Sequence, residues 1–218
     1  MRNVGISTGA LLTVRDNLTK AIPMARESYS LLEVNLHGEN FYQWEVLCRG
    51  GDLDSEAFDY LSLHAPKTDR HLSEARVLGG LIRFRETYDY VVQHPDLLHS
   101  GDWNLLGGQL LIENMDHRKL LGQRPDSLAK LFRKYPRAHF CLDIAHAHYI
   151  DASGRLTEEL LNAFGHKLRQ IHVSVIDEGG QHHSPTTSDL TWINRDLSLV
   201  DNLNIPIIWE AYPRPLAV

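Results

Sequence analysis

Residues 110–143 (LLIENMDHRKLLGQRPDSLAKLFRKYPRAHFCLD) contain the pattern that decides the fold. The stretch opens with a short apolar run at 110–113 and closes with another at 139–143. Between them, residues 125–135 begin with a proline, which a first helical turn tolerates. They carry two basic residues near their end, which suit the negative end of a helix dipole. The stretch therefore predicts a strand, a helix and a second strand.

The same alternation recurs along the whole chain. Short apolar, β-branched runs predict strands at residues 4–7, 31–36, 60–64, 90–94, 110–113, 139–143, 170–175 and 206–210. Helical periodicity appears in most of the gaps, at residues 16–27, 71–87, 125–135, 157–168 and 187–203. Alternating strands and helices indicate an α/β protein with a parallel sheet, and eight units most simply close into a (β/α)8 TIM barrel. A doubly wound open sheet is the alternative fold.

Two units of the expected barrel are irregular. Residues 95–108, after strand four, leave room for one turn of helix at most, so that helix is expected to be short or missing. Only eight residues follow Glu210, so the eighth helix is expected to be missing or rudimentary. We therefore expect a small barrel formed as a single domain by residues 1–218. The apolar flank left uncovered on the first and eighth strands predicts a homodimer, in which a second chain covers the gap.

Composition excludes several classes of function. The chain has 218 residues, 43% of them hydrophobic and 23% charged, which predicts a packed core rather than disorder. A net charge of −6 disfavours nucleic acid as a partner. No apolar run reaches the roughly 18 residues of a membrane helix, no signal segment is recognised, and there are only two cysteines, so we expect a cytoplasmic protein without a membrane partner. The 13 histidines stand out, because histidine is the commonest metal ligand.

Ionisable side chains stand at the carboxyl ends of seven predicted strands. In chain order they are Glu33, His64, His94, Glu113, Asp143, His172 and Glu210. A charged group inside a barrel strand is costly unless it is paired or binds a metal, and the carboxyl-terminal rim of a barrel is where active sites lie. Singly, each has an ordinary alternative, since Glu33 could be a rim carboxylate and Asp143 a helix cap. Seven strands with the same feature at the same end predict a shared site.

The ligand types suggest a divalent cation. Mixed carboxylate and imidazole ligands suit Mn²⁺, Zn²⁺ or Fe²⁺, whereas a site built for Mg²⁺ alone would use oxygen ligands. We therefore expect a divalent metal cofactor, with Mn²⁺ or Zn²⁺ as the best fits and Fe²⁺ or Mg²⁺ as alternatives.

The order of these motifs resembles one family, the xylose-isomerase-like barrels that include endonuclease IV and the metal-dependent sugar epimerases and isomerases. The resemblance runs from Leu61 to Tyr212. It is carried by SLHAP (62–66), VVQHP (91–95), LIEN (111–114), CLDIAH (141–146), IHVS (171–174), HHSP (182–185) and IWE (208–210). The Glu-Asn, Leu-Asp-x-x-His and Ile-His-Val pieces are specific when they occur together in that order.

The resemblance implies a set of functional residues. The metal ligands would be Glu113, Asp143, His172 and Glu210, and in the epimerases the two glutamates also carry the proton, which makes Glu113 and Glu210 the catalytic pair. His146 would hold substrate. Endonuclease IV uses three zinc ions, and its additional ligands would correspond to His64, His94, His146 and His183. Gln181 stands where that family has an aspartate, which puts a third metal in doubt.

Two enzymatic functions follow from the resemblance. The first is a divalent-metal-dependent isomerase or epimerase that acts on a small sugar or sugar-phosphate-like substrate by proton transfer through a metal-stabilised enediolate. The second is a multinuclear zinc phosphoester hydrolase of the endonuclease IV kind. Retention of His64 and His94 favours the hydrolase, whereas Gln181, the net charge and the short loops oppose it. A degenerate barrel used only for binding is the third alternative, and it would have lost the ligands.

Overall fold

Eight parallel strands form a closed barrel in the computed structural model, which describes residues 3–11 and 17–211. The strands are β1 (Val4–Ser7), β2 (Leu31–Asn35), β3 (Tyr60–His64), β4 (Tyr90–Gln93), β5 (Leu110–Glu113), β6 (His139–Asp143), β7 (Leu168–Val173) and β10 (Ile207–Trp209). Around the barrel they follow the order β1-β10-β7-β6-β5-β4-β3-β2. Closure occurs where Val4 pairs with Ile207 and Gly5 with Ile208. The predicted (β/α)8 barrel is therefore confirmed, and the open sheet is wrong.

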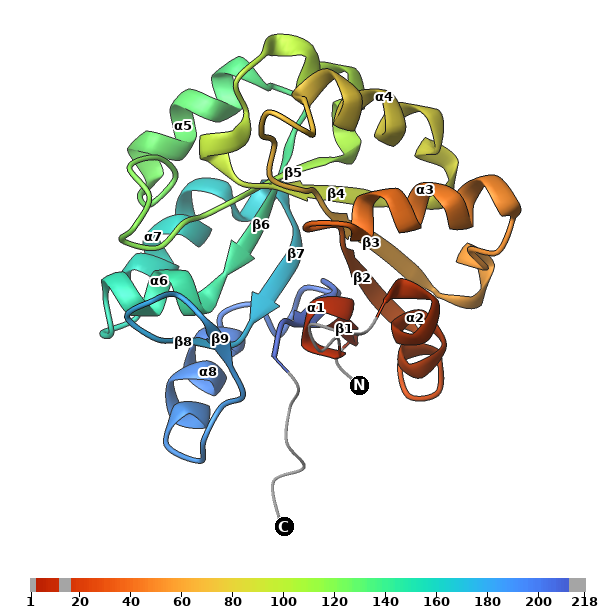
Figure 1. The fold of residues 1–218 in the computed structure, drawn as a ribbon. Coiled ribbons are helices and arrows are strands. Elements are labelled where there is room, and N and C mark those ends of the chain that lie inside the picture. The colour runs from red at the N-terminus through yellow and green to blue at the C-terminus, as the bar shows by residue number, and fades with distance from the viewer. Residues whose placement is uncertain (1–2, 12–16, 212–218) are drawn as a thin grey trace.

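Helices surround the strands on the outside of the barrel (Figure 1). They are α1 (Thr8–Leu11), α2 (Leu18–Arg26), α3 (Asn40–Gly50), α4 (Glu74–Arg83), α5 (Pro125–Lys134), α6 (Ile144–Ile150), α7 (Arg155–Phe164) and α8 (Asp189–Ser198). Short 3-10 segments complete the set: η1 (Ser55–Ala57), η2 (Arg85–Thr87), η3 (Pro95–Leu97), η4 (Gly101–Gln109) and η5 (Gly165–Lys167). Among the described residues, no helix is both long and apolar enough to cross a membrane.

Several elements differ from the sequence-based expectation, among them the short helices α1 and α6, which lie outside the predicted helices. Helix α3 was not predicted. It buries Phe41, Trp44 and Leu47, and the packing of these side chains stabilises the helix although its residues have only modest helix propensity. After β4, residues 95–109 contain no α-helix, as expected, but the 3-10 segment η4 is longer than a single turn and buries Trp103. A two-stranded hairpin, β8 (Val175–Ile176) with β9 (His182–His183), follows β7.

Some expectations fall outside the described residues. The missing or rudimentary eighth helix concerns residues 212–218, and Tyr212, the end of the family resemblance, belongs to the same segment. Asp16, the expected start of the first helix, also lies outside the described part, and α2 begins at Leu18.

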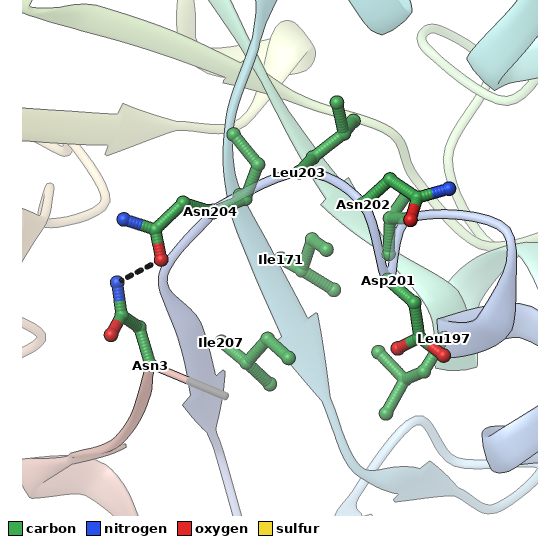
Figure 2. Close-up of a pocket in the computed structure, with 10 residues that line it drawn as sticks. Asn3, Ile171, Leu197, Asp201, Asn202, Leu203, Asn204 and Ile207 are labelled. Carbon is green, nitrogen blue, oxygen red and sulfur yellow. Dashed lines mark hydrogen bonds between the residues drawn. The ribbon is translucent and has the colours of Figure 1, made fainter. Parts of the chain in front are cut away.

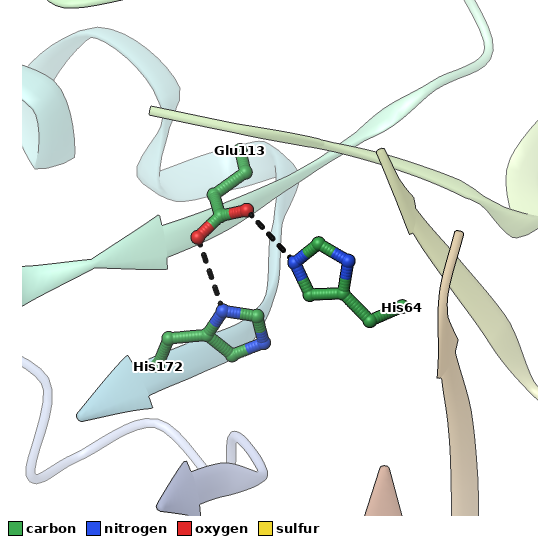
Figure 3. Close-up of side chains that lie close together, drawn as sticks. All are labelled: His64, Glu113 and His172. Carbon is green, nitrogen blue, oxygen red and sulfur yellow. Dashed lines mark hydrogen bonds and ion pairs between the residues drawn. The ribbon is translucent and has the colours of Figure 1, made fainter. Parts of the chain in front are cut away.

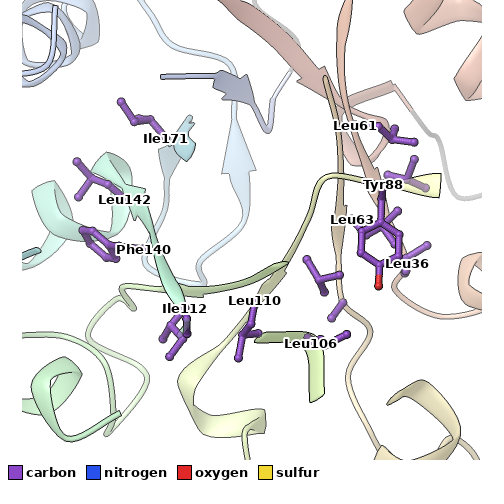
Figure 4. Packing of buried hydrophobic residues seen from close by; sticks show 14 of the residues in the cluster. Leu36, Leu61, Leu63, Tyr88, Leu106, Leu110, Ile112, Phe140, Leu142 and Ile171 are labelled. Carbon is purple, nitrogen blue, oxygen red and sulfur yellow. The ribbon is translucent and has the colours of Figure 1, made fainter. Parts of the chain in front are cut away.

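The largest hydrophobic core lies between the strands and the surrounding helices. Strand side chains such as Leu63, Ile112, Phe140 and Ile171 are fully buried there (Figure 4). Because side chains alternate along a strand, the intervening residues point into the barrel. The interior holds two small apolar clusters, around Leu31, Tyr60 and Ile208 and around Val92, Leu111 and Cys141. Burial of the outward set thus aims the polar strand-end residues inward.

The two ends of the barrel differ in chemistry. At the amino ends of the strands, a cavity of about 460 Å³ is lined by Asn3, Ile171, Asn204 and Ile207 (Figure 2). The Asn3 amide donates to Asn204 Oδ1 at 2.9 Å, which ties the residue before β1 to the loop before β10. The opposite end carries the ionisable residues, because parallel strands present all their carboxyl ends on one side.

We expect the layer between strands and helices to dominate stability. Phe140 is fully buried, with its ring centroid 5.9 Å from Phe164 and 6.3 Å from Phe132. Phe140→Ala should lower the free energy of unfolding by about 3–5 kcal/mol, measured by urea denaturation. Leu120→Ala, at a side chain that is 97% exposed, is the control and should change it by less than about 0.5 kcal/mol. A similar small change for both variants would contradict this packing.

Candidate metal centre

Four side chains from four strands converge at the carboxyl end of the barrel. Glu113 ends β5, Asp143 ends β6, His172 lies near the end of β7, and Glu210 follows β10. One potential ligand atom from each lies within 4.8 Å of those of the other three. His172 Nδ1 is 3.1 Å from Glu113 Oε1 and 3.4 Å from Glu210 Oε1. Residues almost a hundred positions apart in the chain thus form one compact group.

The chemistry of this group fits a divalent cation. Three carboxylates are packed together with one imidazole. Among the described residues three of their oxygens have no hydrogen-bond partner, although each lies 3.2–3.5 Å from the imidazole nitrogen of a further histidine: Glu113 Oε2, Asp143 Oδ2 and Glu210 Oε2. Buried carboxylates are normally paired or bound to a metal, because uncompensated burial of charge is costly. Oxygen and imidazole nitrogen together suit Mn²⁺, Zn²⁺ or Fe²⁺.

The surroundings shift the pKa values of Glu113 and Glu210 in opposite directions. Burial, together with the negative charges of Asp143 and Glu113, raises the pKa of Glu210 well above its ordinary value despite the opposing charge of His172. Burial also acts to raise the pKa of Glu113, but the charge of His172 and its hydrogen bond outweigh burial and hold that pKa well below the ordinary value. A cation among the carboxylates would relieve the repulsion that acts on Glu210.

Glu113 also faces two further histidines, His64 and His94. Its Oε2 is 3.5 Å from His64 Nε2 and 3.2 Å from His94 Nε2, while its Oε1 faces His172. Figure 3 shows the carboxylate of Glu113 between the rings of His64 and His172. His64, Glu113 and His172 form a second group that could hold an ion. One carboxylate therefore stands between two neighbouring sets of potential ligands.

Asp143 is both a helix cap and a member of the group. Its Oδ1 accepts from the backbone N–H of His146 in the first turn of α6 at 2.7 Å, and its Oδ2 has no hydrogen-bond partner among the described residues. Asn114, the residue after the neighbouring strand β5, exchanges two hydrogen bonds of 2.8 Å with the Asp143 backbone. His146 Nδ1 donates to the Asn114 carbonyl at 2.9 Å and lies 3.6 Å from Glu113 Oε1. Asn114 is part of the LIEN motif, but its role in positioning Asp143 was not predicted from the sequence.

The tandem histidines after β7 face different ways. His182 lines the cavity, with its Nδ1 3.3 Å from Glu210 Oε2 and 2.8 Å from Ser174 Oγ. His183 pairs with Asp177 at 3.0 Å and its side chain is 55% exposed. His183, expected as an additional ligand, therefore lies outside the group, and His182 stands beside it instead. Adjacent residues of a strand point to opposite faces, so a prediction that is wrong by one residue selects a side chain that points away from the cavity.

Glu33 lies deeper than the rim. Its side chain is fully buried inside the barrel. Its Oε2 is 2.9 Å from His172 Nε2, the ring nitrogen opposite the one that faces Glu113 and Glu210. An ordinary rim carboxylate would be exposed to solvent. Glu33 therefore contacts the group from below rather than lining the cavity above it.

A cavity of about 440 Å³ opens above the group. Its wall includes Glu113 and Glu210 from the group, the neighbouring His146, and three cationic side chains: Lys67, Arg118 and Lys119. Arg118 is paired with Asp116, and Lys119 with Asp96. Burial and the neighbouring His64 lower the pKa of His37, which also lines the cavity, to about 2, so its imidazole is neutral. The cavity thus combines an anionic floor with a cationic and neutral wall.

No protein-family model matches this sequence, and no curated protein matches it significantly. Solved structures are similar in their fold. A D-tagatose 3-epimerase-like protein is 16% identical with a TM-score of 0.61, over 96% of this chain and 91% of its own. Endonuclease IV from Thermus thermophilus is 18% identical with a TM-score of 0.62, over 97% and 93%. The probable 3-DHS dehydratase AsbF from Bacillus anthracis is 10% identical with a TM-score of 0.64, over 99% and 94%.

This chain has their fold. At 10–18% identity the likeness establishes the architecture and nothing finer. The resemblance to xylose-isomerase-like barrels that the motifs indicated is thus confirmed at the level of the fold.

Divalent cation should stabilise the protein through this group. At a concentration 100-fold above Kd, Mn²⁺ or Zn²⁺ should add about 2.7 kcal/mol, which for a chain of this size raises Tm by roughly 5–10 °C. The measurement is a thermal melt with metal and with EDTA. Glu210→Gln should reduce the shift, whereas His183→Ala, outside the group, should keep it. An equal shift in both variants would place the cation elsewhere.

Proposed function

We propose that the protein is a divalent-metal-dependent isomerase or epimerase that acts on a small sugar or sugar-phosphate-like substrate. One observation carries the proposal: Glu113 and Glu210 present carboxylate oxygens 3.1 and 3.4 Å from His172 Nδ1, at the floor of a cavity of about 440 Å³. Two carboxylates beside one cation site can hold and move a proton at a carbon atom of the substrate. The cavity volume suits a small molecule.

Each part of the site would have a distinct role in the reaction. A bound divalent cation supplies Lewis-acid stabilisation of negative charge on the substrate oxygens. Glu113 and Glu210 remove the proton from the carbon next to the carbonyl group and return it, so that no atom is gained or lost overall. His146 and His182, on the cavity wall, orient substrate hydroxyl groups.

A second candidate is a multinuclear zinc phosphoester hydrolase. The observation that favours it is the position of Glu113 Oε2, which faces both His64 and His94 and could join a second metal to the first. Endonuclease IV is among the similar structures, as is an epimerase-like protein. The net charge of −6 and the small cavity speak for the isomerase or epimerase. A purely binding role is disfavoured because the four central ligand residues are all present and adjacent.

The other expectations remain predictions. Five of them follow from sequence reasoning: a small carbohydrate-like molecule rather than nucleic acid as the favoured partner, a cytoplasmic location, no membrane partner, a single domain and a homodimer. The homodimer depends on residues 212–218, which lie outside the described part of the chain.

Removal of one carboxylate should stop the reaction. Glu113→Gln should lower kcat by about 10²–10⁴-fold, because the amide can neither accept a proton nor bind the cation as an anion. The measurement is deuterium incorporation from D₂O into a panel of aldoses, ketoses and their phosphates, followed by NMR. His183→Ala is the matched control and should exchange deuterium at the rate of the unchanged protein. Full activity in Glu113→Gln would show that the site is wrongly placed.

Metal stoichiometry should separate the two candidate reactions. We expect one tightly bound Mn²⁺ or Zn²⁺ per chain, measured by elemental analysis after gel filtration. His94→Ala should then change activity only modestly, because His94 is not one of the four candidate ligands and contacts only the Glu113 oxygen that faces away from His172. Two or three metals per chain, with loss of one in His94→Ala, would reverse the order in favour of the hydrolase.

A further inference from the structure

A chain of buried polar groups lies beneath the candidate metal centre. Tyr60 on β3 donates from Oη to Gln170 Oε1 at 2.6 Å, and Gln170 Nε2 donates to Glu33 Oε2 at 2.6 Å. The same oxygen of Glu33 lies 2.9 Å from His172 Nε2. Glu33, Gln170 and His172 are fully buried, and Tyr60 is 9% exposed. The chain links β2, β3 and β7 across the barrel interior.

Donor and acceptor chemistry decides how these groups share protons. Because the Tyr60 hydroxyl donates to the amide oxygen of Gln170, the amide nitrogen faces Glu33 as a donor. His172 Nε2 lies 2.6 Å from that nitrogen and 2.9 Å from the Glu33 carboxylate. Without a proton, Nε2 would turn its lone pair toward a carboxylate oxygen, which is repulsive. With a proton, Nε2 donates to Glu33. The second N–H of the Gln170 amide can instead donate to an unprotonated Nε2, so Glu33 and Gln170 favour opposite forms of the ring.

A cation bound to the opposite nitrogen of the ring would decide between these two forms. Nδ1 is the atom that faces Glu113 and Glu210, at 3.1 and 3.4 Å. An imidazole that binds a cation needs an unprotonated nitrogen there, and a hydrogen bond from its other N–H to a carboxylate fixes both its orientation and its protonation. Glu33 is in the place where such a carboxylate is required.

We infer that Glu33 is a positioning residue of the metal centre: it holds His172 with Nε2–H toward itself and Nδ1 toward the cation, and Gln170 and Tyr60 hold Glu33 in turn. The inference rests on the proposed metal-dependent function and assigns a role to a residue that lies outside the cavity. A carboxylate buried in this way, with His172 as its only ion-pair partner among the described residues, is otherwise a net cost to the fold.

The direct test is metal affinity in Glu33→Gln. Removal of this carboxylate should weaken Mn²⁺ and Zn²⁺ binding by about 10–100-fold, measured by competition with a chelating dye. Asp196→Asn is the matched control. Asp196 is a carboxylate of equal burial on α8 that pairs with Thr157 and Arg195 and does not touch the centre. The control should keep its metal affinity even if its melting temperature falls.

A charge relocation distinguishes positioning from simple structural support. Gln170 Nε2 already lies 2.6 Å from His172 Nε2, so Gln170→Glu places a carboxylate beside the same N–H. The double variant Glu33→Gln/Gln170→Glu should therefore recover at least part of the affinity that Glu33→Gln loses. A structural role alone gives no reason for that recovery, so failure of a folded double variant to recover would overturn the inference.

A measurement on the unchanged protein covers the case in which the variants do not fold. In ¹⁵N-histidine-labelled protein loaded with ¹¹³Cd²⁺, the scalar coupling to cadmium should appear on Nδ1 of His172, and Nε2 should carry the proton. Coupling on Nε2 would overturn the inference. If the unchanged protein binds none of these cations, the proposed function fails as well; if it binds them and folded Glu33→Gln binds equally well, only the role of Glu33 fails.

Discussion

Closure of the barrel between β1 and β10 is the constraint on which the site depends. That pairing brings β2 and β3 across from β7, so Glu33 reaches His172 although 139 residues separate them in the chain. In an open sheet β1 and β10 could lie at distant edges, and the ring of His172 could not be contacted from both sides. Backbone hydrogen bonds between two short strands thus decide the geometry of side chains that belong to neither.

The interior of this barrel is unusually rich in buried charge. Glu33, Glu113, Asp143 and Glu210 share one region with several imidazoles, and among the described residues none of them pairs with a lysine or arginine. Desolvation of so many carboxylates opposes folding, and imidazoles offset only part of that cost. The outer apolar layer between strands and helices must supply the excess stability. Function and stability are therefore separated by layer, with chemistry inside the barrel and packing outside it.

The sequence predicts the strands and strand-end residues, which follow from local residue patterns. It does not predict features that depend on contacts between distant parts of the chain. The eight strands were predicted because each is a short apolar run, and Glu113, Asp143, His172 and Glu210 were singled out because they end such runs. Helix α3 was missed because its aromatic residues favour burial more than helix formation. The choice between His182 and His183 depends on the register of a two-residue hairpin strand, and the burial of Glu33 depends on its contacts with Gln170 and His172 on the distant strand β7. Neither quantity is written in any short window of residues.

The double role of Asp143 has a dynamic consequence. One oxygen of this carboxylate accepts from the His146 amide in the first turn of α6, and the same carboxylate belongs to the candidate ligand group. The start of the helix and the binding of a cation therefore depend on a single side chain. Fraying of α6 would therefore turn Asp143 away from the centre, and an occupied centre would suppress fraying. Solvent exchange of the His146 amide hydrogen becomes a local reporter of occupancy, readable in the backbone without observing the ion itself.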